Sequence, residues 1–160
     1  LALAAASGRP VALMHAQGKP RTMQESPAYD DVLLDVADFL AARVAAAEAA
    51  GIPRARLLVD PGIGFGKTPR HNLALIRGLA VLHGLGCAIL VGASRKRFIG
   101  AIGDAPEPAA RGPGSLAVAL EALRQGAQVI RTHDAAETRQ ALALWSALNA
   151  PARAAEAGET

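Results

Sequence analysis

The sequence is poor in aromatic residues, which make up 3% of its 160 residues, and its formal net charge is only +3. Proteins that read nucleic acids usually combine a basic stripe with aromatic side chains that stack on bases, and no such combination is found here. The composition therefore gives no support for a nucleic-acid partner. The mild basicity, supplied mostly by arginine, fits a small anionic ligand or an ordinary solvated surface.

The chain contains one cysteine, Cys87, which cannot form a disulfide within the chain. Because it comes just before an apolar segment, we expect it to pack in the core. No apolar run approaches the roughly 18 residues that span a bilayer, and no charged leader with a cleavage site is present. We therefore expect no membrane partner and a cytoplasmic location.

Hydrophobic residues make up 51% of the chain, which is enough for one domain with a sizeable core. We expect this domain to cover residues 1–150 and residues 151–160 to be a flexible tail. The chain begins without methionine, in an alanine-rich stretch typical of a helix already under way. An N-terminal portion is therefore expected to precede Leu1.

The segment around which the chain is organised is an apolar run, residues 57–60, that ends on Asp60 and enters a glycine-rich loop. This pattern predicts a strand that delivers a carboxylate to a ligand. A P-loop would need glycine at Pro61, and the dinucleotide fingerprint does not fit glycines at alternate positions 62, 64 and 66. A turn-forming role for Asp60 before proline and glycine stays open.

Four apolar segments alternate with four helical patterns. The predicted strands are residues 11–15, 57–60, 88–92 and 129–133, and the predicted helices run from Asp30 or Asp31 to Gly51, over 73–84, over 115–123 and over 134–148. Near-continuous apolar strands that alternate with helices favour an α/β fold with parallel strands. A (β/α)8 barrel needs about 250 residues, so four βα units predict half of a barrel. An open doubly wound sheet is the alternative.

Each predicted strand ends in polar residues, as expected where loops at one face of a sheet build a site. These strand-end residues are His15, Asp60, the group Ser94-Arg95-Lys96, and Arg131 with His133. Arg131 and His133 are two positions apart on a predicted strand and so share a face, where they would hold a diphosphate. An ion pair of Arg131 with Asp134 or Glu137 is the other interpretation, and for His15 a structural role is favoured.

Two further classes of site are not supported by the sequence. No group of His, Cys or carboxylate residues has the short spacing of metal motifs, so no metal ligand is predicted in this chain. Ser94 does not lie in a Gly-x-Ser-x-Gly elbow, which argues against acyl transfer.

Five motifs together resemble the ordered motifs of the dihydropteroate synthases of the pterin-binding family. They are Met14-His15-Ala16-Gln17-Gly18, Asp60-Pro61-Gly62-Ile63-Gly64-Phe65-Gly66-Lys67, Gly92-Ala93-Ser94-Arg95-Lys96, Gly114-Ser115-Leu116-Ala117 and Arg131-Thr132-His133-Asp134. They occur in the family's order over nearly the whole chain. The resemblance covers only the C-terminal half of such an enzyme.

The resemblance implies a transferase of folate biosynthesis that condenses 4-aminobenzoate with 6-hydroxymethyl-7,8-dihydropterin diphosphate, giving 7,8-dihydropteroate and diphosphate. It further implies a cytoplasmic homodimer when full length, a sulfonamide target, and Mg²⁺ bound by a ligand in the N-terminal half. The implied catalytic residues are Lys96, Arg131 and His133. These three are also implied to bind substrate, together with Met14, Asp60, Phe65, Lys67, Gly92 and Ser94.

The resemblance also assigns places to these side chains. Asp60, Lys96, Gly92 and Met14 would surround the pterin, and Arg131 with His133 would neutralise the departing diphosphate. Ser94 would face the carboxylate of 4-aminobenzoate, while Phe65 and Lys67 would belong to the loop that shapes its pocket.

The sequence departs from the family pattern at Ala16, where a methionine is usual, and at Ala110, where a glutamate usually precedes the arginine. Because the resemblance covers half an enzyme, we expect little or no synthase activity from this chain alone. Two alternatives are a pterin-binding methyltransferase-like protein, which shares the barrel, and a non-catalytic pterin-binding paralogue.

Overall fold

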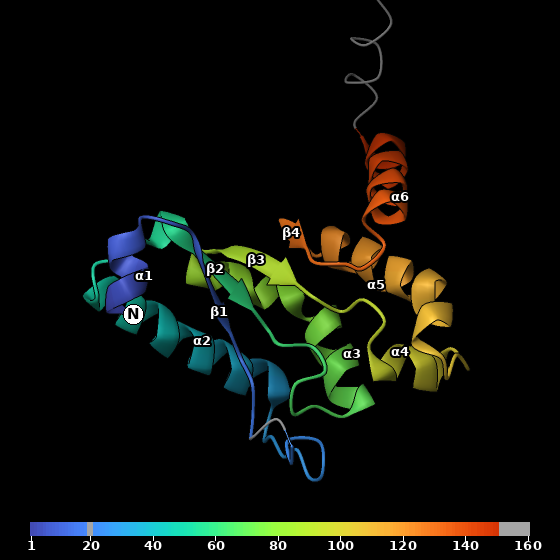
Figure 1. The fold of residues 1–160 in the computed structure, drawn as a ribbon, viewed down its shortest axis with the longest axis horizontal. Helices are drawn as coiled ribbons and strands as arrows, with labels where there is room; N and C mark the ends of the chain where they lie inside the picture. The colour runs from blue at the N-terminus through green and yellow to red at the C-terminus, as the bar shows by residue number, and fades with distance from the viewer. Residues whose placement is uncertain (19–20, 151–160) are drawn as a thin grey trace, which may run out of the picture.

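The structure, a computed structural model, describes residues 1–18 and 21–150. Its centre is a four-stranded parallel sheet in the order β1-β2-β3-β4 (Figure 1). The strands are β1 (Val11–Met14), β2 (Leu57–Asp60), β3 (Ala88–Val91) and β4 (Val129–Ile130). The predicted tail, residues 151–160, lies outside the described residues.

The strand order decides between the two predicted folds. In a doubly wound sheet the order reverses at a switch point, whereas in a (β/α)8 barrel each strand pairs with the next one along the chain. Here sequence neighbours pair throughout, and a helix follows each strand. The observed order is that of half a barrel.

Within the described ranges, six α-helices and three 3₁₀ segments connect or flank the strands. The α-helices are α1 (Ala2–Ser7), α2 (Val32–Ala49), α3 (Pro69–Arg77), α4 (Arg97–Ile102), α5 (Gly112–Arg124) and α6 (Ala135–Asn149), and the 3₁₀ segments are η1 (Arg54–Arg56), η2 (Leu79–Leu85) and η3 (Pro108–Arg111). Asp31 caps α2 as predicted, since its carboxylate accepts hydrogen bonds from the amides of Leu33 and Leu34. No helix in the described part of the chain is long and apolar enough to cross a membrane.

Several predicted boundaries were wrong. The single helix expected over residues 73–84 is α3 followed by η2, because Gly78, which has a low helix propensity, lies between them. The loop expected between β3 and α5 contains α4 and η3. α5 begins at Gly112 rather than Ser115, since Pro113 is compatible with a first helical turn.

The strand predicted over residues 129–133 contains only two residues, Val129 and Ile130. Its pairing continues one residue further, because the amide of Arg131 donates to the carbonyl of Val91 at 2.9 Å. His133 lies beyond the strand, so the prediction that it shares a strand face with Arg131 was wrong.

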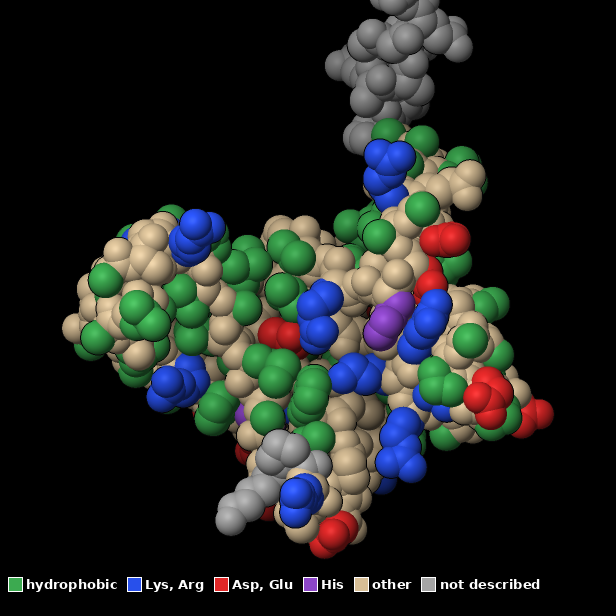
Figure 2. Space-filling model, in the orientation of Figure 1, with side chains coloured by type: hydrophobic (Ala, Val, Ile, Leu, Met, Phe, Trp, Pro, Cys, Tyr) green, Lys and Arg blue, Asp and Glu red, His purple; other side chains and the backbone are tan. Residues whose placement is uncertain are grey.

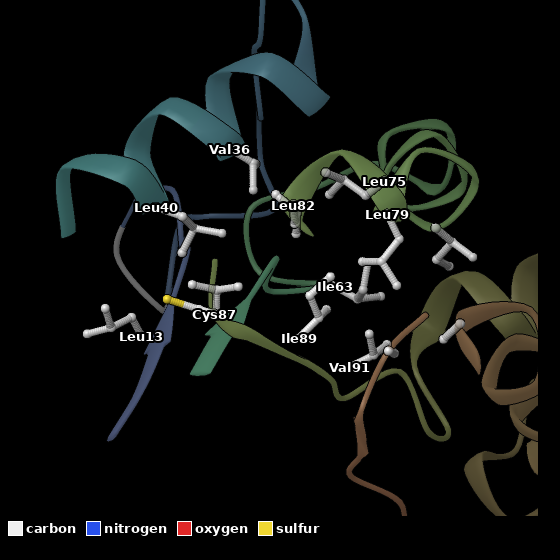
Figure 3. Packing of buried hydrophobic residues seen from close by; sticks show 14 of the residues in the cluster. Leu13, Val36, Leu40, Ile63, Leu75, Leu79, Leu82, Cys87, Ile89 and Val91 are labelled. Atoms are coloured by element: carbon white, nitrogen blue, oxygen red, sulfur yellow. The ribbon is translucent and has the colours of Figure 1, made fainter. Parts of the chain in front are cut away.

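One face of the sheet packs against helices and forms the core (Figure 3). Leu13, Val59 and Ile89 are neighbours in register on this face and are buried, as is Val91. They pack with side chains from α2, α3 and η2, including Val36, Leu40, Leu75 and Leu82. Cys87 is buried in the same cluster, which confirms its predicted core position.

The other face of the sheet carries the alternate residues of each strand. Register places Met14 beside Asp60, Leu58 beside Ala88, and Leu90 beside Val129. These residues point away from the helix-covered core because side chains alternate along a strand. The same alternation continues to Gly92 and Arg131, so predicted site residues from all four strands, Met14 and Asp60 among them, share the face that the helices leave uncovered.

Candidate functional site

The site lies at the carboxyl ends of the strands, and Asp60 is its most buried acid. Asp60 is the last residue of β2, and only 4% of its surface is exposed. Its Oδ1 accepts a hydrogen bond from the amide of Gly62 at 2.7 Å. Burial raises the pKa of the carboxyl, while the Gly62 amide and the cations Arg131, Lys96 and Lys67 oppose that rise. A carboxylate so placed can accept hydrogen bonds from the N–H groups of a ligand.

Gly92 and Arg131 lie against each other across β3 and the end of β4. A Cβ atom added to Gly92 would lie 2.5 Å from Nη2 of Arg131, so the guanidinium occupies the space above this glycine. The alternative in which Arg131 pairs with Asp134 does not hold in the structure. Asp134 instead pairs with Arg95, whose Nε lies 3.1 Å from its Oδ2.

Lys96 lies between this group and the glycine-rich loop. Its Nζ is 3.9 Å from the centroid of the Phe65 ring, within the range of a cation–π contact. Desolvation lowers the pKa of Lys96, as does Arg131, and Asp60 acts in the opposite direction. Figure 2 shows Lys and Arg side chains, with a histidine, gathered near the middle of this view of the molecule.

Ser94 holds His133. Its hydroxyl oxygen accepts a hydrogen bond from the amide of His133 at 3.2 Å and lies 3.0 Å from Nδ1 of the same residue. A cavity of about 290 Å³ is lined by Gly92, Ser94, Lys96, Arg131, Thr132 and His133. The structure therefore brings together the predicted anion-binding residues, although β4 ends before them.

A larger cavity of about 720 Å³ lies on the other side of Lys96. It is lined by Met23, Gln24, Pro27, Gly64, Phe65, Lys67, Thr68, Pro69, Asn72, Lys96, Arg97, Phe98 and Ala101. Lys96 lines both cavities. Aromatic and cationic side chains in one cavity suit an aromatic anion. Ser94 does not line this cavity.

His15 and Lys67 form a buried contact that sequence reasoning missed. Lys67 is 3% exposed, and its Nζ lies 2.9 Å from Nδ1 of His15 and 3.0 Å from the carbonyl oxygen of Phe65. Burial, with the charge of Lys67, lowers the pKa of His15 to about 4. Burial also lowers the pKa of Lys67 to about 8. The ammonium of Lys67 thus ties the glycine-rich loop to the end of β1.

The low pKa of His15 predicts a loss of stability in acid. The unfolded chain takes up this proton near pH 6.5 and the folded chain only near pH 4, so stability falls as the pH drops between these values. We expect the free energy of unfolding to fall by roughly 2–3 kcal/mol more in the wild type than in His15→Gln, which keeps an acceptor for Lys67. Urea titrations at pH 4.5 and 7 measure this difference, and equal pH dependence in both proteins would contradict it.

Met14 lies beside Asp60 in register and is 39% exposed on the uncovered face. Several loop contacts had no sequence signal. Asn72 is buried and accepts from the amide of Gly64 at 2.7 Å, and the Tyr29 hydroxyl donates to the carbonyl of Gly66 at 2.7 Å. These contacts hold the loop that carries Phe65.

Among residues 1–18 and 21–150, no three His, Cys, Asp or Glu side chains are grouped so that they could hold a metal ion.

Comparison with known proteins places this geometry in a family. Residues 1–133 match the family described as pterin binding enzyme. The dihydropteroate synthase of Escherichia coli is 48% identical over 142 residues, covering 89% of this chain and 50% of that protein. The chain thus spans about half the length of the curated relatives it matches, and these relatives do not favour the methyltransferase-like or non-catalytic alternatives.

Two solved structures agree with the fold. Dihydropteroate synthase from Stenotrophomonas maltophilia superposes with a TM-score of 0.90 at 45% identity, over 93% of this chain and 56% of that one. The enzyme from Thermus thermophilus, solved in complex with 4-aminobenzoate, gives 0.88 at 43% identity, over 93% of this chain and 60% of that one. The predicted half of a (β/α)8 barrel is confirmed, and the chain belongs to the family of pterin-binding enzymes.

Proposed function

We propose that this chain forms the half of a dihydropteroate synthase that binds the pterin and its diphosphate. The observation that carries the proposal is the buried carboxylate of Asp60, which ends a strand on the uncovered face of the sheet with Arg131 and Lys96 among the charges acting on it. One anionic acceptor and two cations match a ligand with N–H donors at one end and a diphosphate at the other.

In this proposal the pterin ring lies over the end of the sheet. Asp60 accepts hydrogen bonds from the amino and ring N–H groups of the pterin, and Lys96 donates to the ring. Gly92 has no side chain, and the guanidinium of Arg131 takes that space beside the ring. Met14, half-exposed beside Asp60, supplies apolar contact.

The smaller cavity would receive the diphosphate. Arg131 and His133 line it and would stabilise the negative charge that develops as the C–O bond to diphosphate breaks. Ser94 orients His133 through its hydroxyl, and we therefore assign it to this side of the site rather than to the aminobenzoate carboxylate.

The larger cavity would receive 4-aminobenzoate, with its ring near Phe65 and its carboxylate near the cations Lys67 and Arg97. Diphosphate leaves with the electron pair of the broken C–O bond, the amine nitrogen forms the new C–N bond to the pterin methylene carbon, and the amine loses one proton. The chain's own contribution is position and charge, since no protein nucleophile is needed.

We also propose the finer properties that the family resemblance implies: a homodimer in the cytoplasm that sulfonamides inhibit. A Mg²⁺ ion would be held by the half of the enzyme that this chain does not span, and no step above passes through it.

The proposal is tested by combining the chain with the N-terminal half of the Escherichia coli enzyme, since the chain covers 50% of that enzyme and its motifs resemble those of the family's C-terminal half. We expect dihydropteroate formation from the combined halves, and little or none from this chain alone. The matched control combines the same N-terminal half with a Lys96→Met chain, which we expect to be at least ~100-fold slower. A combination in which both halves fold and associate but no product forms would contradict the proposal.

A further inference from the structure

The turn that carries Ser94, Arg95 and Lys96 is strained. Arg95 has φ of 57°, and it shares this left-handed backbone conformation with only one other non-glycine residue in the described ranges, Asp104 at 48°. This conformation is strained for a residue with a side chain and persists only where its surroundings hold it. The two residues flank α4, Arg95 before its start and Asp104 after its end.

The side chain of Arg111 contacts the backbone near both ends of α4. The guanidinium of Arg111 donates through Nη1 to the carbonyl of Arg95 at 3.0 Å and through Nε to the carbonyl of Ala105, the residue after Asp104, at 2.9 Å. Its Nη2 donates to the carbonyl of Pro106. A Cβ atom added to Gly100, inside α4, would lie 2.5 Å from Nε of Arg111, so the guanidinium also lies against the helix itself.

Ser115 forms hydrogen bonds with the backbone of both Arg95 and Arg111. Its Oγ accepts from the amide of Arg95 at 2.9 Å and donates to the carbonyl of Arg111 at 2.6 Å. The backbone of Arg95 is therefore held at its N–H by Ser115 and at its C=O by Arg111. Lys96, the next residue, projects toward the ring of Phe65.

We propose that Arg111 is a positioning residue that sets the place of Lys96 in the ligand site. It contacts neither cavity itself, and it acts by holding the left-handed turn at Arg95 and the far end of α4 at the same time. The effect of Arg111 on ligand binding rests on the proposed function, whereas its effect on the position of Lys96 does not.

The position of Lys96 can be measured without any ligand. The chain has three lysines, Lys19, Lys67 and Lys96, so ¹³C-lysine labelling gives a simple NMR spectrum. A side chain over an aromatic ring is shifted upfield, and we expect Arg111→Gln to lose most of the upfield shift of Lys96 while the Lys67 signals stay in place. The matched control is Arg124→Gln on α5, which removes an exposed arginine paired with Glu121 and leaves Lys96 unchanged.

A second substitution separates positioning from general stability. Glycine adopts a left-handed backbone without strain, so adding Arg95→Gly to Arg111→Gln should return much of the lost shift. If Arg111→Gln does not fold, Arg111→Lys takes its place, because an ammonium cannot reproduce the fork that reaches three carbonyls. An unchanged Lys96 signal in whichever folded variant is measured would overturn the proposal.

The affinity for the ligand is then measured for the same variants and the wild type. We expect Arg111→Gln to bind 6-hydroxymethyl-7,8-dihydropterin diphosphate between about 10-fold and 100-fold more weakly than the wild type. Absence of binding by the wild type would count against the proposed function and leave the NMR result standing. A moved Lys96 signal with unchanged affinity would overturn the role of Arg111 in the site.

Discussion

Gly62→Ala is expected to destabilise the chain by about 3–5 kcal/mol, because the new methyl group meets backbone rather than side chain. A Cβ atom at this position would lie 1.8 Å from the carbonyl oxygen of His15, and the glycine has φ of +68°. The neighbouring backbone cannot withdraw easily, since the amide of His15 donates to the carbonyl of Asp60 at 3.0 Å. Thermal unfolding should show a midpoint lower by roughly 10 °C.

The matched control is Gly84→Ala, at the exposed end of η2. No atom lies within 4 Å of a Cβ built there, so we expect a change within about 0.5 kcal/mol. Equal unfolding midpoints for Gly62→Ala and the wild type would show that the loops after β1 and β2 do not approach each other as described.

Asp60→Asn is expected to weaken binding of 6-hydroxymethyl-7,8-dihydropterin diphosphate by about 100-fold while the fold remains. The asparagine oxygen can still accept from the amide of Gly62, so the loop keeps its hydrogen bond. The substitution removes the negative charge and replaces one acceptor with an NH₂ donor, which faces the N–H groups of the pterin. Isothermal titration of both proteins measures the difference.

The stability of the Asp60→Asn variant provides an independent test. Because burial raises the pKa of Asp60, the ionised carboxylate is costly in the folded chain, and we expect the asparagine variant to unfold at the same or a slightly higher urea concentration. Asp38→Asn, on the exposed side of α2, is the matched control and should change neither property. If Asp60→Asn binds as tightly as the wild type, Asp60 is not the pterin acceptor.

Much of the fold could be predicted from the sequence, because its signals are local. Apolar runs of strand length, the Asp31 cap and the turn residues around Gly51 and Pro53 marked the units, and the structure contains all four predicted strands. The boundaries were less predictable. The change from α3 to η2 at Gly78 was not predicted, because a single glycine inside a helical pattern does not fix a boundary.

In the candidate site, too, the features set by local sequence were predictable and the contacts between separate loops were not. Asp60 and Arg131 were predicted at strand ends because polar residues follow apolar runs there, and the strand order brings both to one edge of the sheet. The partner of Lys67 and the three carbonyls held by Arg111 depend on how separate loops meet, and no spacing in the sequence encodes them. The contact of Ser94 with His133 was not predicted for the same reason, since His133 comes from another strand end.

We propose that the carboxyl ends of the four strands form one site for a pterin diphosphate. The most direct measurement is a titration of the ¹⁵N-labelled chain with 6-hydroxymethyl-7,8-dihydropterin diphosphate, followed by the backbone amide signals. We predict saturable shifts at Gly62, Gly92 and His133, and small shifts in α2. Saturable shifts confined to the groove between α5 and α6, or no saturable shift in the folded chain, would contradict the account.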